Sequence, residues 1–196
     1  MKNALALAVL LAAAPLAAQA DGLKYSYVEG GYFNADIDTT DGDGFQLRGS
    51  AQVHNNVYLF GAYGSASADE ANIDLTDTQF GAGFRWGVSP QTDLLAEVSQ
   101  VRQKIEVAGL SDTYSGLRVG AGVRGRLAES VEGWAKVNFT GGDFDSAVSG
   151  QLGVQYNFTP TWGALFELEK GETGQDELST ESHDYTKYLV GVRASF

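Results

Sequence analysis

The chain has 196 residues, with 25 glycines, 3 prolines, no cysteine and a formal net charge of −12 at pH 7. Its length suits one domain. The absence of cysteine excludes disulfide bonds, thiol chemistry and a lipid-anchored cysteine. The negative charge argues against a nucleic-acid partner, because neutralising phosphates requires a basic surface.

The first twenty residues are predicted to form a secretory signal peptide. Lys2 supplies a positive start, residues 4–16 are apolar, and small residues at Ala18 and Ala20 precede the expected cleavage site. Cleavage between Ala20 and Asp21 leaves residues 21–196 as one mature domain, with a net charge of about −13 because Lys2 is removed. No later segment reaches the 18 consecutive apolar residues of a transmembrane helix.

Ten segments of the mature chain are predicted to be β-strands, because apolar and polar residues alternate along them. In chain order they are 25–34, 45–53, 57–65, 79–88, 93–107, 117–127, 131–139, 150–158, 162–168 and 185–196. Segment 57–65 carries no charge, so its inward face stays open. Segment 93–107 loses the pattern at Gln100, which indicates a bulge or an early exit from the apolar zone.

The connections between these segments alternate in length. Short turns are expected at 54–56, 89–92, 128–130 and 159–160, and longer, acidic loops at 37–43, 66–74, 108–113, 141–145 and 171–184. Outer-membrane barrels place short turns on the periplasmic side and long loops outside the cell. The even number of strands then puts both termini on the periplasmic side.

Charged residues in the middle of the strands fall opposite the apolar row. A charge that faces lipid near the membrane midplane costs about 2–4 kcal/mol for Arg or Lys, so these residues are predicted to line the lumen. Glycines on that face (81, 83, 120 and 122) leave room for long side chains. The predicted lumen set is Glu29, Arg48, Arg85, Glu97, Arg118, Arg124, Arg126, Glu132, Lys136, Glu167, Glu169, Lys187 and Arg193, which has a surplus of cations.

The last segment is predicted to close the barrel. Its apolar face ends on Phe196, the last residue, and a closing strand that ends in Phe resembles the C-terminal signature of Gram-negative outer-membrane barrels. That resemblance implies recognition by the barrel-insertion machinery. A soluble antiparallel sandwich or lipocalin-like barrel would show the same alternation. Phe196, the connection lengths and aromatic residues near the strand ends favour a closed all-β, antiparallel transmembrane up-and-down barrel. The aromatic residues are Tyr32, Trp86, Tyr156, Phe158, Trp162 and Tyr188.

The chain also resembles a known group of proteins. Its overall pattern is similar to the small outer-membrane barrels of the OmpA/OmpX type, which implies eight strands as the alternative to ten. The stretch from Tyr25 to Tyr32, Tyr-Ser-Tyr-Val-Glu-Gly-Gly-Tyr, is similar to the first strand of a xanthomonad family of small outer-membrane proteins. That family has sometimes been labelled a quorum-type factor, so the resemblance implies an exported or vesicle-borne signalling or virulence factor as one possible role.

The function expected from the sequence is a non-enzymatic, monomeric barrel in the bacterial outer membrane that interacts through its loops with lipid and lipopolysaccharide. A narrow pore for water or small, possibly anionic, solutes is the alternative. Neighbouring residues on a strand face opposite ways, so Ser182, His183 and Asp184 are not expected to form a catalytic triad. No cofactor or dedicated metal site is predicted, although the acidic loops could bind divalent cations that bridge to lipopolysaccharide.

Overall fold

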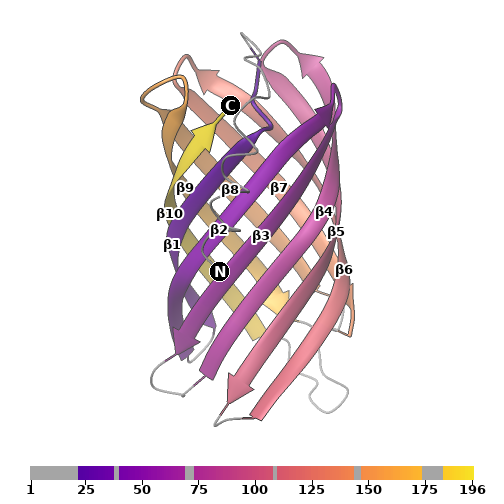
Figure 1. Cartoon of the computed structure of the whole chain (residues 1–196), viewed down its shortest axis with the longest axis vertical. Helices are drawn as coiled ribbons and strands as arrows, with labels where there is room; N and C mark the ends of the chain where they lie inside the picture. The colour runs from indigo at the N-terminus through magenta and orange to yellow at the C-terminus, as the bar shows by residue number, and fades with distance from the viewer. Residues whose placement is uncertain (1–21, 38–39, 69–72, 108–109, 144–146, 174–182) are drawn as a thin grey trace, which may run out of the picture.

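The computed structural model describes residues 22–37, 40–68, 73–107, 110–143, 147–173 and 183–196. These form a closed antiparallel barrel of ten strands (Figure 1), so the prediction of ten strands is confirmed over the alternative of eight. The predicted signal peptide lies outside the described residues. The strands are β1 (Tyr27–Ile37), β2 (Thr40–His54), β3 (Val57–Ala68), β4 (Ile73–Ser89), β5 (Thr92–Val107), β6 (Leu110–Ala128), β7 (Val131–Gly142), β8 (Ala147–Asn157), β9 (Trp162–Thr173) and β10 (His183–Ser195).

Each strand pairs with the next along the chain, and β10 closes the ring on β1. At this seam the register runs from Tyr27 opposite Ser195 to Ile37 opposite Tyr185. Because the sheet has no open edge, its peptide groups are paired even where the surroundings are apolar. Among the described residues, no helix is long and apolar enough to cross a membrane.

The two faces of the sheet have opposite character. Aliphatic and aromatic side chains cover the exterior, whereas buried polar and charged groups fill much of the interior. The undecided segment 57–65 follows the same rule, since Tyr58 is buried inside and Leu59 is exposed. The aromatic residues predicted near the strand ends are all exposed: Tyr32, Trp86, Tyr156, Phe158, Trp162 and Tyr188.

Several predicted boundaries are wrong, because the strands continue beyond the apolar zone. Of the expected loop 37–43, Ile37 and residues 40–43 belong to β1 and β2. The described residues of 66–74 and 108–113 are also strand, as are residues 141–142. Segment 93–107 contains no bulge, since its pairing with β4 and β6 is uninterrupted from Asp93 to Val107. The pattern changes at Gln100 because the surroundings of the strand change there. The fifth predicted loop lies largely outside the described residues.

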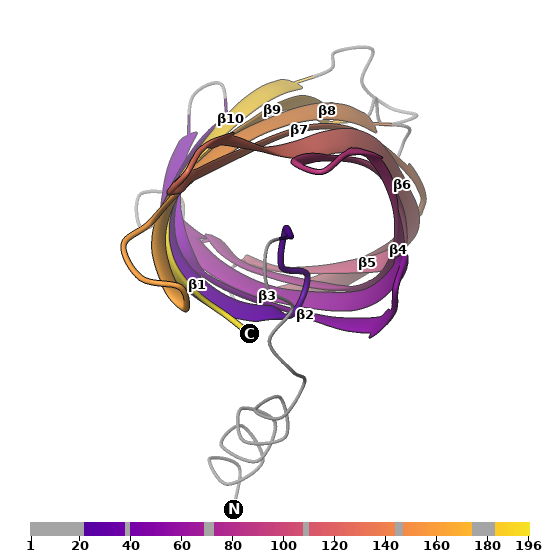
Figure 2. The ribbon, with the colours of Figure 1, turned by 90° about the horizontal axis from the view of Figure 1, so that it is seen from above.

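The first predicted strand begins later than expected. Residues 22–26 precede β1 and lie within the ring of strands, as the indigo start of the described chain shows (Figure 2). Tyr25, which was predicted to belong to the strand, is almost completely buried there. The segment therefore lies inside the barrel and does not belong to the sheet.

Candidate functional site

Large interior side chains lie over glycines of the neighbouring strands. The ring of Tyr58 covers Gly83, and the indole of Trp134 covers Gly153, so closely that a Cβ atom at either glycine would overlap the ring. Gly81, Gly120 and Gly122 are covered in the same way by Phe60, Asn138 and Lys136. The glycines on the interior face thus make the space that the long side chains need.

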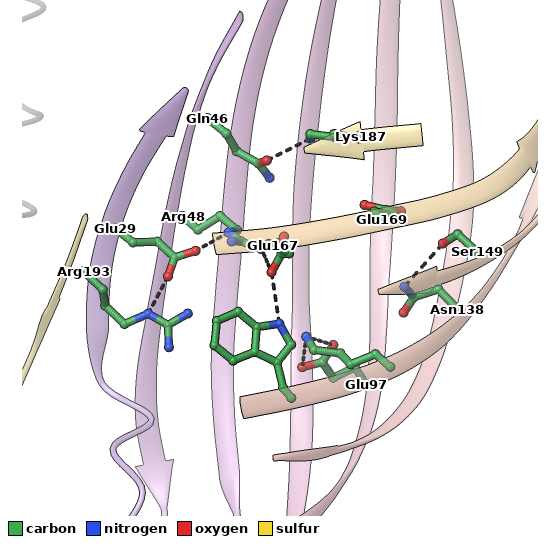
Figure 3. Close-up of polar contacts among 12 residues, drawn as sticks. Glu29, Gln46, Arg48, Glu97, Asn138, Ser149, Glu167, Glu169, Lys187 and Arg193 are labelled. Atoms are coloured by element: carbon green, nitrogen blue, oxygen red, sulfur yellow. Dashed lines mark hydrogen bonds and ion pairs between the residues drawn. The ribbon is translucent and has the colours of Figure 1, made fainter. Parts of the chain in front are cut away.

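One network of ions joins the two strands at the seam of the barrel to their neighbours (Figure 3). Glu29 on β1 receives a 2.5 Å hydrogen bond from Nε of Arg193 on β10 and pairs with Arg48 on β2. Arg48 also donates Nη1–H to both oxygens of Glu167 on β9, at 2.9 and 3.1 Å. The indole N–H of Trp134 on β7 completes the network at 3.0 Å from Glu167. Five strands are therefore linked through the interior.

A second network joins strands on the interior face that are not neighbours. Lys136 on β7 donates to both carboxylate oxygens of Glu97 on β5, at 3.1 and 3.0 Å. The hydroxyl of Tyr58 on β3 donates to the same carboxylate at 2.6 Å. Each contact passes over one intervening strand, where Gly122 on β6 and Gly83 on β4 leave room for the side chain.

The N-terminal segment is held across the end of the barrel that carries the short turns by a third group of contacts. The Tyr25 hydroxyl donates to Asp93 at 2.8 Å, and its ring lies between the guanidinium groups of Arg85 and Arg124, each 5.0 Å from the ring centre. Arg124 also donates to the carbonyl of Lys24 at 3.0 Å and to Glu132 at 2.7 Å. The segment is thus bonded to the wall opposite the strand into which it leads.

Apolar contacts reinforce this arrangement. Leu23 and Tyr25 form a buried cluster with Tyr58 on β3 and Leu95 on β5, and the two tyrosine rings lie 5.0 Å apart. At the rim, Lys24 donates to the carbonyl of Pro160 at 2.7 Å. We call residues 22–26 the N-terminal stopper, because both polar and apolar contacts hold them across the mouth at the short-turn end.

The remaining predicted lumen residues lie nearer the opposite end or at the rim of the short-turn end. Lys187 donates to Gln46 at 2.8 Å, and Arg118 donates to Thr140 at 2.9 Å. Glu169 accepts a 2.8 Å hydrogen bond from Tyr185 and lies within electrostatic reach of Arg118 and Lys187. Arg126 lies at the rim of the short-turn end, where it donates to the carbonyl of Gly22 at 3.4 Å.

Two interior carboxylates were missed by the sequence prediction. Asp93 is buried and pairs with Arg85 at 3.1 Å. Asp77 accepts a hydrogen bond from Gln103 and lies within electrostatic reach of Lys187 and Arg118. Asp93 has the same strand parity as Glu97, so alternation could have revealed it, whereas Asp77 lay between a predicted loop and a predicted strand. With both included, the surplus of cations in the lumen falls to a single charge.

Little open space remains among these groups. A cavity of about 40 Å³ lies between Tyr25, Arg48, Glu97, Trp134 and Arg193, which is room for about three water molecules. Atom Nη2 of Arg48 is buried without a hydrogen-bond partner among the described protein groups, as expected where water completes the bonding. The side chains around this cavity are therefore closely packed.

The remaining residues considered in the sequence are placed as follows. No group of three or more His, Cys, Asp or Glu residues among the described ones is arranged to hold a metal ion. His54 is exposed at the end of β2, and Ser182 lies outside the described residues. Phe196 extends the exterior row of β10, and its backbone N–H donates to the carbonyl of Ser26 at 2.9 Å.

Comparison with known proteins agrees with this architecture. The sequence model of the outer membrane protein beta-barrel domain matches residues 4–196. Among solved structures, the translocator domain of the autotransporter NalP from Neisseria meningitidis is similar, with a TM-score of 0.51, 13% identity and coverage of 99% of this chain and 96% of that one. The NanC porin has a TM-score of 0.50 and 12% identity, over 87% of this chain and 100% of that one. These likenesses show the fold alone. No curated protein matches the sequence.

Proposed function

Since the chain belongs to the outer membrane protein beta-barrel domain family, we propose that it is a non-enzymatic, closed barrel of the bacterial outer membrane. Its role is structural and lies at the cell surface, and it does not conduct solutes. The N-terminal stopper is the observation that carries this proposal. A wide or open pore would not place a buried tyrosine, bonded to three strands of the wall, across its own mouth.

The ion networks support the same conclusion. Glu97, Lys136 and Tyr58 connect three strands on the interior face, and the seam network connects five. Moving a solute through would separate buried charges, and an uncompensated buried charge costs several kcal/mol. The alternative of an anion-selective pore rested on a surplus of interior cations, and Asp77 and Asp93 almost remove that surplus.

The partners follow from this placement. We assign membrane lipid and lipopolysaccharide to the exterior and the barrel-insertion machinery to β10 and the adjoining Phe196, and we treat the barrel as a monomer. Divalent cations bridging the acidic extracellular end to lipopolysaccharide belong to the same proposal. An exported or vesicle-borne signalling role is the competing proposal. It would be favoured if folded protein were recovered mainly from vesicles or culture medium rather than from outer membranes.

Planar-bilayer conductance tests the closed barrel. The protein from residue 21 onward, refolded and verified by heat-modifiable gel migration, is expected to give no discrete channels. The double variant L23A/Y25A removes the buried side chains of the stopper and is expected to show brief, small conductance steps, because water gains access to the periplasmic mouth. Reproducible channels in the unaltered protein would contradict the proposal, whatever conductance the double variant shows.

A further inference from the structure

The charged side chains that surround Tyr25 are positioned by the barrel itself. Arg85 on β4 donates Nε–H to a carbonyl of the β2–β3 turn at 2.8 Å and pairs with Asp93 on β5 at 3.1 Å. Arg124 on β6 donates Nε–H and Nη2–H to Glu132 on β7, at 3.2 and 2.7 Å. These partners belong to the sheet or to a short turn, and not to the N-terminal stopper. The two guanidinium groups and the Asp93 carboxylate would therefore keep their places if Tyr25 left.

The same side chains make a site that matches a phenol. The hydroxyl of Tyr25 donates to Asp93 at 2.8 Å, and the two guanidinium groups lie 5.0 Å from its ring centre, within cation–π range. Tyr58, whose ring centre is 5.0 Å away, and Leu95 add apolar contacts. We call this arrangement the phenol socket, and its residues are Tyr58, Arg85, Asp93, Leu95 and Arg124.

The segment that carries Tyr25 can leave the socket without breaking the sheet. β1 begins at Tyr27, so the stopper lies inside the ring of strands but outside their hydrogen-bonded ladder (Figure 2). Its backbone accepts hydrogen bonds from the barrel at the carbonyls of Gly22, Lys24 and Ser26. Water at the short-turn end could replace these bonds at little net cost. The cavity of about 40 Å³ already borders Tyr25, so the departing ring would enlarge an existing space.

We propose that the phenol socket is a binding site for small uncharged phenols, which Tyr25 occupies as an intramolecular ligand. A free phenol that enters from the short-turn end makes the same hydrogen bond and ring contacts, and so competes with the stopper. The carboxylates of Asp93 and Glu132 balance the two guanidinium groups, which disfavours an ionised ligand. The site rests on the proposed function for the position of the stopper, but its occupancy is measured without any conductance.

The test measures the binding of para-fluorophenol and of fluorobenzene by fluorine NMR. The refolded protein is held in detergent micelles, and protein-free micelles serve as the blank. Y25A leaves the socket without its internal ligand. Because a hydrogen bond to a charged acceptor contributes about tenfold or more in affinity, Y25A should bind para-fluorophenol at least that much more tightly than fluorobenzene. The unaltered protein should bind the phenol about tenfold more weakly than Y25A, since the tethered Tyr25 competes at a millimolar effective concentration.

Two further variants locate the binding. Tyr32 also donates to an aspartate but is exposed on the exterior, so Y32A should bind both probes as the unaltered protein does. Y25A/D93A lacks the acceptor for the hydroxyl and should lose most of the preference for the phenol. Equal affinities of Y25A and Y32A for para-fluorophenol would overturn the proposal, as would equal affinities of Y25A for the two probes.

A second measurement uses the unaltered protein and does not depend on the folding of Y25A. Trypsin is expected to cut after Lys24 only when the stopper has left the mouth, because the Lys24 carbonyl is bonded to Arg124 and its ammonium group to Pro160. para-Fluorophenol should accelerate this cut and fluorobenzene should not, and K24Q identifies the product. Binding of the phenol to the unaltered protein without faster cleavage would refute the socket. Failure of binding in a protein that still does not conduct would refute the socket and leave the closed barrel standing.

Discussion

The interior and the exterior of this barrel are made from the same ten strands, and neighbouring residues often belong to opposite surroundings. On β8, Gln155 is 1% exposed inside, whereas the adjacent Tyr156 is 57% exposed outside. A soluble sheet buries its apolar face, but here the apolar face covers the outside. Moving an apolar side chain from lipid into the protein interior gains little free energy. The stability of this fold therefore comes from its closed hydrogen-bonded ladder and its interior polar contacts.

The same kinds of contact occur in both regions, which allows matched tests. A glutamate pairs with cations inside at Glu29 and outside at Glu106. A tyrosine hydroxyl donates to an aspartate inside at Tyr25 and outside at Tyr32. If enclosure by the barrel decides the strength of a contact, then identical substitutions should cost more free energy of unfolding inside than outside.

The largest difference is expected for glutamate. Glu29 is 3% exposed and holds Arg48 and Arg193 together at the seam. The variant E29Q leaves two guanidinium groups without their shared carboxylate, and breaking a buried pair costs about 3–5 kcal/mol. Urea unfolding of the refolded protein in phospholipid vesicles would measure the loss.

The matched control is E106Q. The Glu106 side chain is 47% exposed and pairs with Lys104 in contact with water, so its replacement should cost less than about 1 kcal/mol. Similar losses in E29Q and E106Q would contradict the idea that the interior pairs hold the seam closed.

An intermediate effect is expected for glycines on β8. In G153A the new methyl group would overlap the indole of Trp134, displace it and weaken its hydrogen bond to Glu167. Overpacking of this kind costs about 1–3 kcal/mol. In G150A the methyl group would face outward, 3.9 Å from the nearest atom, the carbonyl oxygen of Lys170, so stability should stay the same or rise slightly.

Near-UV circular dichroism adds a local readout to the unfolding measurement. Trp134 is the buried tryptophan, whereas Trp86 and Trp162 are exposed outside. G153A should therefore change the aromatic signal and G150A should not. An unchanged signal in G153A, with stability equal to that of G150A, would show that the close fit over Gly153 has no energetic role.

The sequence predicted the strands of the barrel better than the residues that fill its lumen. Alternation with period two identified ten strands and sorted side chains such as Glu29 and Arg193 by face, because that sorting depends only on the strand's own geometry. It could not predict that Tyr25 leaves the strand register and enters the lumen, since that depends on Arg85 and Arg124 from distant strands.

The ends of the strands were also mispredicted, for a related reason. Polar residues above the apolar belt were assigned to loops, yet they continue the hydrogen-bonded ladder, as the pairing of Ile37 with Thr40 shows. In water, polarity does not distinguish a loop from an exposed strand, because both can carry acidic residues. For the same reason the sequence did not identify Asp77 as an interior residue. Its interior position follows from strand alternation once β4 is known to begin at Ile73.

The smallest difference is expected for the two tyrosines. Tyr25 is 2% exposed and donates to Asp93 at 2.8 Å, whereas Tyr32 is 59% exposed and donates to Asp43 at 2.6 Å. Y25F removes a hydrogen bond to a buried carboxylate that keeps only Arg85, and should cost about 1–2 kcal/mol. Y32F leaves Asp43 free to bond to water, so its cost should be below about 0.5 kcal/mol. The shorter contact is thus expected to be the weaker one, because water competes for it. The measurement is the free energy of unfolding of both variants in vesicles. Equal losses would mean that water reaches Tyr25 in the N-terminal stopper as readily as it reaches Tyr32 on the exterior.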